Sequence, residues 1–379
     1  MRTLCVFHTG GVGGPQRSLT QAVEWLASRG EVQFVVPEQG ATTAQYAAYG
    51  PGSVRPYSAL TYARGPLEGV RLARRAGREV RMFRRELRER RPDLVIAVTT
   101  VLPALVVAAR LERVPCVVYA AELHAPRRRA AGRALVTGTA GLAQGIVACS
   151  AAVASQFPRR PRRPLAVAYP PVGEEYAGGD REAGRARLGI VGAEPCLLVV
   201  GSISPGRGQD VAIGALASIR QRLPGARLAV VGAPHARAVD LMYASELRSL
   251  AARCGVEDAV VLAGTAESMA DVYAAADIVL NPARSPEGFG RVAAEALRAG
   301  RPVVASRVGA IPEVVRDGID ALLVEPADEA ALASAVVRLA EDRALAERLV
   351  ESGRRRVLER FGREQDLAAW KSVVDAALR

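Results

Sequence analysis

The chain has 379 residues and a mass of 40.0 kDa, which is more than one hydrophobic core usually serves, so we expect two domains. Half of the residues are apolar, 24% are charged and the mean hydropathy is +0.10, which excludes a chain that is disordered throughout. The formal net charge of +12 lies in residues 1–180, where 25 arginines stand against 13 acidic residues, and this excess suits an anionic partner.

The N-terminal segment has the pattern of a buried strand followed by a glycine loop and a helix. Thr3–Phe7 is a short apolar run, Gly10–Gly14 is rich in glycine, and apolar residues recur at helical spacing from Pro15 onward. No small-residue cleavage site follows the apolar run, so we expect no signal peptide. Glycine loops after a first strand occur in many unrelated folds, so this loop alone indicates no particular ligand.

Strands and helices alternate through the rest of the first half, which predicts a parallel sheet with helices on both faces. Arginines recur every three or four residues between two of these strands and form a basic stripe if the segment is helical. The stripe suits anionic lipid headgroups or an acidic partner, or else it is a solvated helix face. Nucleic acid is a poorer explanation, because the region has few aromatic residues and no binding motif. The predicted strands are Glu31–Val36, Leu94–Val98, Pro115–Tyr119 and Gly145–Cys149, and the stripe consists of Arg71, Arg74, Arg75, Arg78, Arg81, Arg85 and Arg88.

A segment rich in proline, glycine and arginine, Pro158–Gly179, predicts a boundary between two domains. The alternation of strands and helices then starts again, which predicts a second doubly wound domain. Open parallel sheets bind ligands at the carboxyl ends of their strands, so we expect the binding site in a cleft between the domains. The predicted strands are Cys196–Val200, Arg227–Val231, Val260–Ala263, Asp277–Leu280, Pro302–Ala305 and Ala321–Val324, and a last helix over Glu364–Leu378 has an apolar stripe of Leu367, Trp370, Val374 and Leu378.

Cysteine and histidine are too few and too scattered for a disulfide framework or a local zinc site. The five cysteines never form a Cys-x-x-Cys pair, and the three histidines lie over a hundred residues apart. This pattern indicates a reducing compartment, so we expect a cytoplasmic protein. No Asp-x-Asp pair follows a predicted strand in a way that suits a divalent metal, so we expect neither a metal nor another cofactor.

The most informative segment is Asn281–Glu295, where a strand ends, a loop carries Glu287, and a helix begins. The first backbone N–H groups of this helix would point toward a ligand with the positive end of the helix dipole behind them, which suits a diphosphate. We expect Glu295, about one turn into the helix, to reach outward and accept hydrogen bonds from hydroxyl groups. Two carboxylates beside an anion-binding helix end suit a nucleotide-sugar. The N–H groups concerned belong to Gly290, Arg291 and Val292.

The sequence Glu287-Gly-Phe-Gly-Arg-Val-Ala-Ala-Glu295 resembles the Glu-x7-Glu motif of the family-four retaining glycosyltransferases, which have the GT-B fold. Its continuation over Ala296–Glu313 and Gly318–Pro326 resembles the same family. The resemblance implies an α/β protein with two Rossmann-like doubly wound parallel-sheet domains facing a cleft. We expect an acceptor-binding domain over residues 1–175, a nucleotide-sugar-binding domain over 176–362, and a C-terminal helix over 363–379 that packs back on the first domain. The expected reaction moves a hexosyl-type sugar from a nucleoside-diphosphate sugar to a hydroxyl group, with retention of configuration and without a metal.

The resemblance also implies roles for particular residues. The first Glu of the motif and the backbone N–H groups after it hold the donor sugar, the second Glu holds the ribose, and the loop before Tyr273–Asp277 lies against the base. The donor-binding residues are therefore expected to be Gly11, Gly13, Gly14, Ser202, Arg207, Gly264, Thr265, Ala266, Glu287, Gly288, Phe289, Gly290, Arg291, Val292 and Glu295, and the catalytic candidates are Glu287, Arg207, His124 and Glu122.

The loop Gly201–Gly208 resembles the family's Gly-Arg-x5-Lys-Gly segment, whose two cations neutralise the departing diphosphate. Arg207 stands where Lys is usual and keeps the charge, whereas Ser202 stands where Arg is usual and removes one. The loss matters because leaving-group charge is stabilised electrostatically at such a site. Arg284 and Arg17 are candidate replacements.

Two segments of the first half resemble the family more weakly. Gly10–Gly14 matches its Gly-Gly-x-Gly-Gly loop, which faces donor and acceptor. Glu122-Leu123 resembles its His-Glu-Leu stretch, but Ala121 stands in place of the histidine and the nearest histidine is His124. These residues are candidates for catalysis or acceptor positioning, although a lone histidine is more often structural.

Two other functions remain open at this point. A nucleotide-sugar 2-epimerase of GT-B fold would bind the same donor, but it needs several acid–base groups around the sugar, and the scarcity of histidine disfavours it. A catalytically inactive binding protein is suggested only by Ser202. The acceptor is also open: a lipid-linked molecule on an anionic membrane, which implies peripheral contact with the inner face of the membrane, an anionic soluble molecule, or a natural product. The base and sugar of the donor are not determined.

Overall fold

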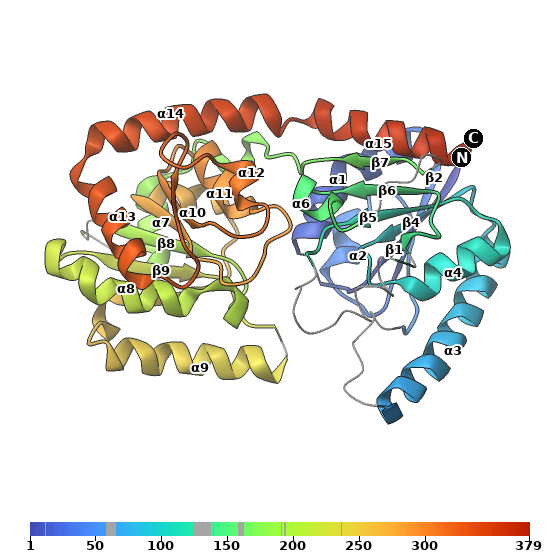
Figure 1. Ribbon diagram of the computed structural model, residues 1–379, viewed down its shortest axis with the longest axis horizontal. Coiled ribbons are helices and arrows are strands. Elements are labelled where there is room, and N and C mark those ends of the chain that lie inside the picture. The colour runs from blue at the N-terminus through green and yellow to red at the C-terminus, as the bar shows by residue number, and fades with distance from the viewer. Residues whose placement is uncertain are drawn as a thin grey trace. The chain divides into compact units, whose positions relative to one another are not determined.

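The chain folds into two compact units, shown in the computed structural model of Figure 1. The structure describes residues 1–11, 13–57, 66–123, 138, 140–157, 163–190, 192, 195–235 and 237–379. In the helix that begins at Pro66, it describes side chains from residue 75 onward. Unit 1 comprises Met1–Pro171 and Arg363–Arg379, and unit 2 comprises Val172–Gly362. The boundary after Pro171 lies slightly before the expected one at residue 175, and the final helix belongs to unit 1.

Unit 1 is built on a seven-stranded parallel sheet with the strand order β3-β2-β1-β4-β5-β6-β7. Its inner strands are apolar and buried almost throughout, as expected for parallel strands covered on both faces. The three-residue edge strands β3 and β7 were not predicted. The strands are β1 (Arg2–Phe7), β2 (Glu31–Val36), β3 (Gly52–Val54), β4 (Leu94–Val98), β5 (Cys116–Ala120), β6 (Gly145–Ala148) and β7 (Leu165–Val167).

The C-terminal helix of the chain completes the core of unit 1. It packs against β5, β6 and β7 (Figure 1), and Gly145 lets it approach closely, since a Cβ there would lie 2.5 Å from Val373 Cγ1. Trp370 is fully buried, with its ring 5.4 Å from that of Tyr119. The predicted apolar stripe is wrong at its end, because Leu378 is 36% exposed. The described helices of unit 1 are α1 (Gly14–Ser28), α2 (Ala41–Tyr46), α3 (Pro66–Arg90), α4 (Pro103–Glu112), α6 (Ala151–Ala154) and α15 (Arg363–Leu378).

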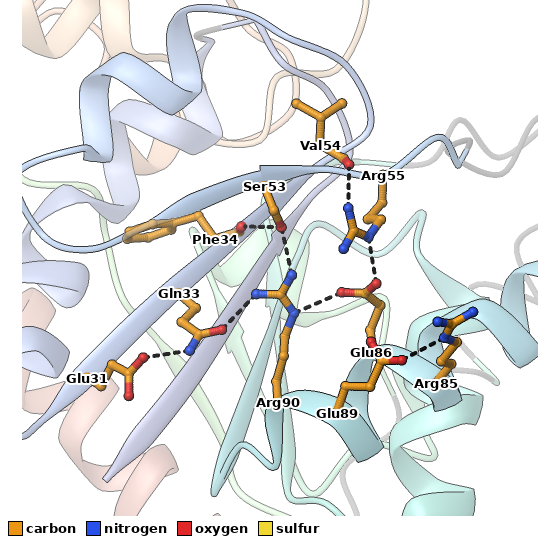
Figure 2. A network of polar contacts seen from close by, with 10 residues as sticks. All are labelled: Glu31, Gln33, Phe34, Ser53, Val54, Arg55, Arg85, Glu86, Glu89 and Arg90. Carbon is orange, nitrogen blue, oxygen red and sulfur yellow. Dashed lines mark hydrogen bonds and ion pairs between the residues drawn. The ribbon is translucent and has the colours of Figure 1, made fainter.

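The basic segment forms helix α3, as predicted, and its last turn is tied to the sheet through polar contacts (Figure 2). The Arg90 guanidinium donates to Gln33 at 2.7 Å, to Ser53 at 2.9 Å and to Glu86 at 2.8 Å. Burial alone would raise the pKa of Glu86, but hydrogen bonds from Arg55 and Arg90 outweigh it and hold the pKa below its usual value. This part of the basic segment therefore has a structural role.

Much of the basic stripe is neutralised by carboxylates. Arg75, Arg85 and Arg88 form ion pairs with Glu79, Glu89 and Glu112 at 3.1, 2.6 and 2.9 Å. Arg78 and Arg81 are exposed and form no ion pair with any residue that the structure describes, while the side chains of Arg71 and Arg74 lie outside the described part. The described basic face of α3 is therefore weaker than the sequence suggests.

Unit 2 is built on a six-stranded parallel sheet with the strand order β10-β9-β8-β11-β12-β13. Its strands are β8 (Cys196–Val200), β9 (Arg227–Val231), β10 (Val260–Gly264), β11 (Ile278–Asn281), β12 (Val303–Ser306) and β13 (Leu322–Val324). Its helices are α7 (Arg181–Leu188), α8 (Gln209–Arg222), α9 (Ala238–Arg253), α10 (Met269–Ala275), α11 (Arg291–Arg298), α12 (Ile311–Val314), α13 (Glu329–Glu341) and α14 (Arg343–Arg360), with short 3-10 turns η1 (Glu174–Tyr176), η2 (Pro205–Arg207) and η3 (Glu257–Ala259).

Both sheets confirm the predicted doubly wound α/β class. The strand order reverses between β1 and β4 in unit 1 and between β8 and β11 in unit 2. In open parallel sheets, ligands bind at the carboxyl ends of the strands at such reversal points. We therefore expect a site after β1 and β4 in unit 1 and a site after β8 and β11 in unit 2.

Candidate donor site

The loops that follow β8 and β11 are in direct backbone contact. The carbonyl of Gly206 accepts hydrogen bonds from the N–H groups of Arg284 at 3.0 Å and Ser285 at 3.1 Å. Gly208 has φ +72°, and a Cβ there would lie 1.9 Å from the carbonyl oxygen of Pro282. A side chain at 208 would therefore separate the two loops, and glycine is required for both the backbone conformation and the contact.

This contact brings together two candidates that are 80 residues apart in the sequence. Arg207 Nη1 lies 2.5 Å from Glu287 Oε1 in an ion pair. The side chain of Glu287 is only 10% exposed, whereas that of Arg207 is 42% exposed. The arginine thus presents a charge to solvent from a fixed position, and the carboxylate beneath it holds it there.

The backbone of Glu287 is itself fixed by the segment after β12. Its carbonyl accepts a hydrogen bond from the N–H of Ala310 at 2.9 Å. Gly309 has φ +59°, and a Cβ there would lie 2.4 Å from the Glu287 carbonyl oxygen. The stretch after β12 in the predicted continuation of the motif therefore acts as a support for Glu287.

Helix α11 begins just beyond Glu287. Gly290 precedes it with φ +90°, offers no capping side chain, and has no room for a Cβ, which would lie 2.9 Å from Ile311 Cγ1. Phe289 is buried edge-on against Phe361, with 5.2 Å between the ring centroids. The segment Gly288–Val292 therefore places an uncapped helix start beside Arg207 and Glu287, and such a helix start attracts anions.

The expected outward direction of Glu295 is wrong. Its side chain is 6% exposed; Oε2 accepts a hydrogen bond from the Tyr273 hydroxyl at 2.7 Å, and Oε1 accepts one from Arg291 Nε at 3.0 Å. Arg291 also donates to the Tyr176 hydroxyl at 3.1 Å. Burial raises the pKa of Tyr273 well above its usual value, so its hydroxyl remains a donor to the carboxylate. Glu295 faces inward because α10 and η1 supply these partners on that side of α11.

The cation missing at Ser202 is not replaced by Arg284. Arg284 forms an ion pair with Asp210, whose other oxygen accepts a hydrogen bond from the Tyr243 hydroxyl at 2.7 Å. Ser202 is half-buried, and its carbonyl accepts a hydrogen bond from Gln209 Nε2 at 3.0 Å. Arg17, the other candidate, belongs to unit 1. Within the two loops 201–208 and 281–290, Arg207 is therefore the cation that lies beside Glu287.

The third predicted loop of the donor site lies at the same edge of the sheet. Gly264 ends β10 with φ +68°, and its carbonyl accepts a hydrogen bond from the N–H of Gly232 at 2.8 Å. The Thr265 carbonyl accepts one from Arg187 at 2.6 Å, and Ala266 follows, half-buried. One strand, β9, separates β10 from β8, so this loop is a neighbour of the Arg207 loop along the edge.

The remaining predicted residues belong to unit 1. In the glycine loop before α1, Gly11 donates to Thr9 Oγ1 at 3.2 Å and Gly13 donates to Gln16 Oε1 at 3.0 Å, while Gly14 is the first residue of the helix. Glu122 follows β5 and is half-buried. His124 lies outside the described residues. In the part of the chain that the structure describes, no group of three or more His, Cys, Asp or Glu side chains is arranged to hold a metal ion.

Sequence reasoning missed Tyr176 and Tyr273 in unit 2. The two tyrosines hold the motif helix, and no local pattern marks them because their partners are over 20 and over 100 residues away in the sequence.

Two family models match the chain, one in each half. Residues 12–176 match "Glycosyltransferase Family 4", and residues 194–342 match "Glycosyl transferases group 1". The D-inositol 3-phosphate glycosyltransferase of Nocardia farcinica is 39% identical over 191 residues, which are 49% of this chain and 41% of that protein. The chain thus aligns with less than half of this relative's length. Both halves nevertheless match glycosyltransferase families, in agreement with the resemblance noted in the sequence.

Solved structures share the fold over the whole chain. The structure of HepE from Anabaena in complex with UDP has a TM-score of 0.81 and 23% sequence identity to this chain. The match covers 99% of this chain and 100% of the HepE chain. WaaG, a glycosyltransferase involved in lipopolysaccharide biosynthesis, has a TM-score of 0.70 and 18% identity, with 98% and 99% of the two chains covered. At these identities the similarity establishes the fold alone, and that fold is GT-B, as predicted.

Proposed function

We propose that this chain, whose two halves match glycosyltransferase families and which has the GT-B fold, transfers a sugar from a nucleoside-diphosphate sugar to a hydroxyl acceptor. The observation that carries the proposal is the Arg207–Glu287 ion pair of 2.5 Å beside the uncapped start of α11. A cation, a carboxylate and a helix start at one edge of a parallel sheet suit a ligand with a diphosphate at one end and hydroxyl groups at the other.

In this proposal the donor rearranges the ion pair. The diphosphate lies against Gly290, Arg291 and Val292 at the helix start and takes the exposed guanidinium of Arg207 as its counter-ion. Glu287 then loses its partner and accepts hydrogen bonds from hydroxyl groups of the sugar. The charge that develops on the leaving diphosphate meets a preorganised cation and helix dipole in place of a metal ion. No nucleophile for a double displacement is evident among the described residues beside Arg207 and Glu287, so we propose departure and attack on the same face, with retention.

Other contacts with the donor are proposed on the same basis. The loop Gly264–Ala266 would lie against the base, and Glu295 would accept a ribose hydroxyl, since each carboxylate oxygen keeps a lone pair beyond its bond to Tyr273 or Arg291. HepE has been determined with UDP-glucose, and for this chain a UDP-sugar is accordingly the first donor to test. We propose that unit 1 binds the acceptor, with Gly11, Gly13 and Gly14 near the donor and Glu122 and His124 near the acceptor.

For the acceptor and the cellular location of the enzyme, we propose broad classes only. The name of the Nocardia relative indicates a phosphorylated polyol acceptor for that protein, and WaaG works in lipopolysaccharide synthesis. A cytoplasmic enzyme that touches an anionic membrane through the exposed Arg78 and Arg81 of α3 fits the charge of unit 1. No helix within the described ranges is long and apolar enough to cross a bilayer. Sedimentation with anionic liposomes at low salt tests the contact, and exchange of both arginines for Glu should abolish it.

Thermal-shift screening against a panel of nucleotide-sugars tests the proposed function most directly. A donor present at about 100 times its dissociation constant should stabilise the protein by about 2.7 kcal/mol. Arg207→Ala should reduce turnover by a factor of about 100 or more, and Glu287→Gln should weaken donor binding while keeping a similar shape. Arg220→Ala is a matched control, because Arg220 also pairs with a carboxylate of unit 2, Asp258, but on the exposed side of α8. Full turnover by Arg207→Ala would contradict the role of Arg207, and epimerisation of the donor without any acceptor would contradict a transferase.

A further inference from the structure

A second cluster of polar side chains lies where the strand order of the first sheet reverses. Phe7 of β1 pairs with Val98 of β4, and Val98 pairs with Tyr119 of β5. The residues that come directly after these strands therefore lie side by side at the carboxyl edge of the sheet. His8 directly follows β1, Thr99 directly follows β4, and Glu122 is the second residue after β5. None of these three side chains caps a helix or forms an ion pair among the described residues.

Thr99 combines an unfavourable backbone conformation with a buried hydroxyl group. Its φ of +87° lies in a region that β-branched residues rarely adopt. It is 1% exposed, and its hydroxyl makes no hydrogen bond of good geometry, although it faces the Glu122 carboxyl group and acts to lower the pKa of that group. Backbone strain and an unsatisfied buried hydroxyl in one residue are features that proteins retain mainly at binding sites.

His8 presents one nitrogen to this edge. The imidazole is half-buried; Nδ1 is buried and makes no hydrogen bond of good geometry, so Nε2 is left to meet a ligand. Burial lowers the pKa of His8 against the opposing effect of the Val98 backbone, so the ring is neutral near pH 7. A neutral imidazole either accepts or donates one hydrogen bond at the exposed nitrogen.

Glu122 completes the cluster from β5. Its Oε2 lies 3.4 Å from the N–H of Ala121 and from the Thr100 hydroxyl, and 3.5 Å from the N–H of Thr100. Burial raises the pKa of Glu122, and these donors offset part of the rise. No cation is among the described groups that contact Glu122 or His8. Among the described residues, the cluster therefore offers hydrogen bonds without positive charge.

We propose that His8, Thr99 and Glu122 form a binding site for the hydroxyl groups of an uncharged polyol, and that His8 supplies the imidazole which is absent at Ala121. The inference rests on the proposed function, because the bound polyol, or the uncharged part of a larger molecule, is then the glycosyl acceptor. It also narrows the way in which the acceptor binds: a phosphate group of that molecule would bind elsewhere, since no described cation contacts the cluster.

Histidine NMR provides a test that does not depend on turnover. The chain has three histidines, so selective 15N labelling gives three imidazole signals, and the signal lost in His8→Gln identifies His8. Titration of the 379-residue chain with myo-inositol should shift the His8 signal, whereas inorganic phosphate at the same concentrations should not. A His8 signal that responds to phosphate and not to inositol would overturn the proposal.

Two pairs of variants separate a ligand contact from a structural role. A Gln side chain places an amide group near the position of Nε2 and an Asn side chain places one near Nδ1, so His8→Gln should bind myo-inositol within about threefold of the parent and His8→Asn should bind about tenfold more weakly. Thr99→Val keeps the shape and removes the hydroxyl; it should raise the melting temperature while weakening inositol binding, and Thr99→Ser should restore binding.

The outcomes also separate this inference from the proposed function. If nucleotide-sugars stabilise the protein and myo-inositol binds equally well to the parent, His8→Asn and Thr99→Val, the cluster is not the acceptor site although the enzyme assignment stands. If inositol binding follows the variants but no nucleotide-sugar binds, the polyol site stands and the transferase assignment fails. Equal melting temperatures of Thr99→Val and the parent, with unchanged inositol binding, would contradict a functional origin of the unsatisfied hydroxyl.

Discussion

Replacement of Asp366 by Asn should stabilise unit 1 at alkaline pH. Asp366 lies in the first turn of α15 and is 2% exposed, and its Oδ2 makes no hydrogen bond of good geometry, although the indole N–H of Trp370 faces it and acts to lower its pKa. Burial raises its pKa from 3.8 to about 7. A carboxyl group in this environment must lose its proton within the folded protein when the pH rises, and that loss is unfavourable.

The magnitude follows from the difference between the folded and unfolded pKa. The folded state holds the proton more tightly, so the associated stability is fully present below pH 3.8, falls as the pH rises, and is lost once the pH passes about 7. One pKa unit corresponds to about 1.4 kcal/mol, so the full difference corresponds to about 4 kcal/mol. Asp366→Asn removes the titration. We therefore expect a gain of about 4 kcal/mol at pH 8.5 and about 2 kcal/mol at pH 5.5.

Urea unfolding followed by tryptophan fluorescence measures the change in the free energy of unfolding of unit 1. Trp25 and Trp370 are the two tryptophans of the chain, and both belong to unit 1. Asp375→Asn is a matched control on the same helix, because Asp375 is 51% exposed and pairs with Arg29, and it should change stability by less than about 1 kcal/mol. An equal gain for Asp366→Asn at both pH values, or a loss at pH 8.5, would refute the reasoning.

Three further substitutions test the framework of unit 2. Gly309→Ala should cost at least about 1–2 kcal/mol from its left-handed backbone alone and should also displace Glu287, which a reduced thermal shift with a bound nucleotide-sugar would reveal. Tyr273→Phe removes the donor to the buried Glu295 carboxylate and should cost about 1.5–3 kcal/mol in urea unfolding; unchanged stability would mean that Arg291 satisfies the carboxylate alone. Asp328→Ala removes the side chain that caps α13 and should cost about 1 kcal/mol, with Asp328→Asn close to the parent.

The sequence alone predicts the strands at the centre of each sheet. Leu94–Val98, Cys196–Val200 and Arg227–Val231 are found with the predicted bounds, because parallel strands buried on both faces give uninterrupted apolar runs. The edge strand β3, Gly52–Val54, was missed because a three-residue strand with one neighbour needs no such run. The same holds for β7, Leu165–Val167, which lies within the proline-rich segment that was assigned to the domain boundary.

Side-chain direction was less predictable than element type. The spacing of Glu287 and Glu295 placed one carboxylate before α11 and the other within it, and both are found there. Which way Glu295 points depends on Tyr273 and Tyr176, which pack against α11 from distant parts of the chain. The basic stripe of α3 is partly neutralised for the same reason, because Glu112, which pairs with Arg88 of the stripe and with the neighbouring Arg84, lies on α4. A pattern within one helix does not show what a neighbouring helix brings to it.

The geometry of the candidate donor site depends on its glycines more than on its charged residues. Arg207 reaches Glu287 because Gly206 and Gly208 let one loop pack against the other, and Glu287 keeps its place because Gly309 lets a third segment approach its carbonyl oxygen. At Gly208 and Gly309 a Cβ would meet backbone, whereas at Gly206 it would meet the exposed side chain of Ser285. The charged residues can then vary within limits, as Arg in place of Lys at 207 illustrates, whereas a side chain at Gly208 or Gly309 would move the loops apart. Mutational tolerance at this site should therefore be lowest at residues that never touch the donor.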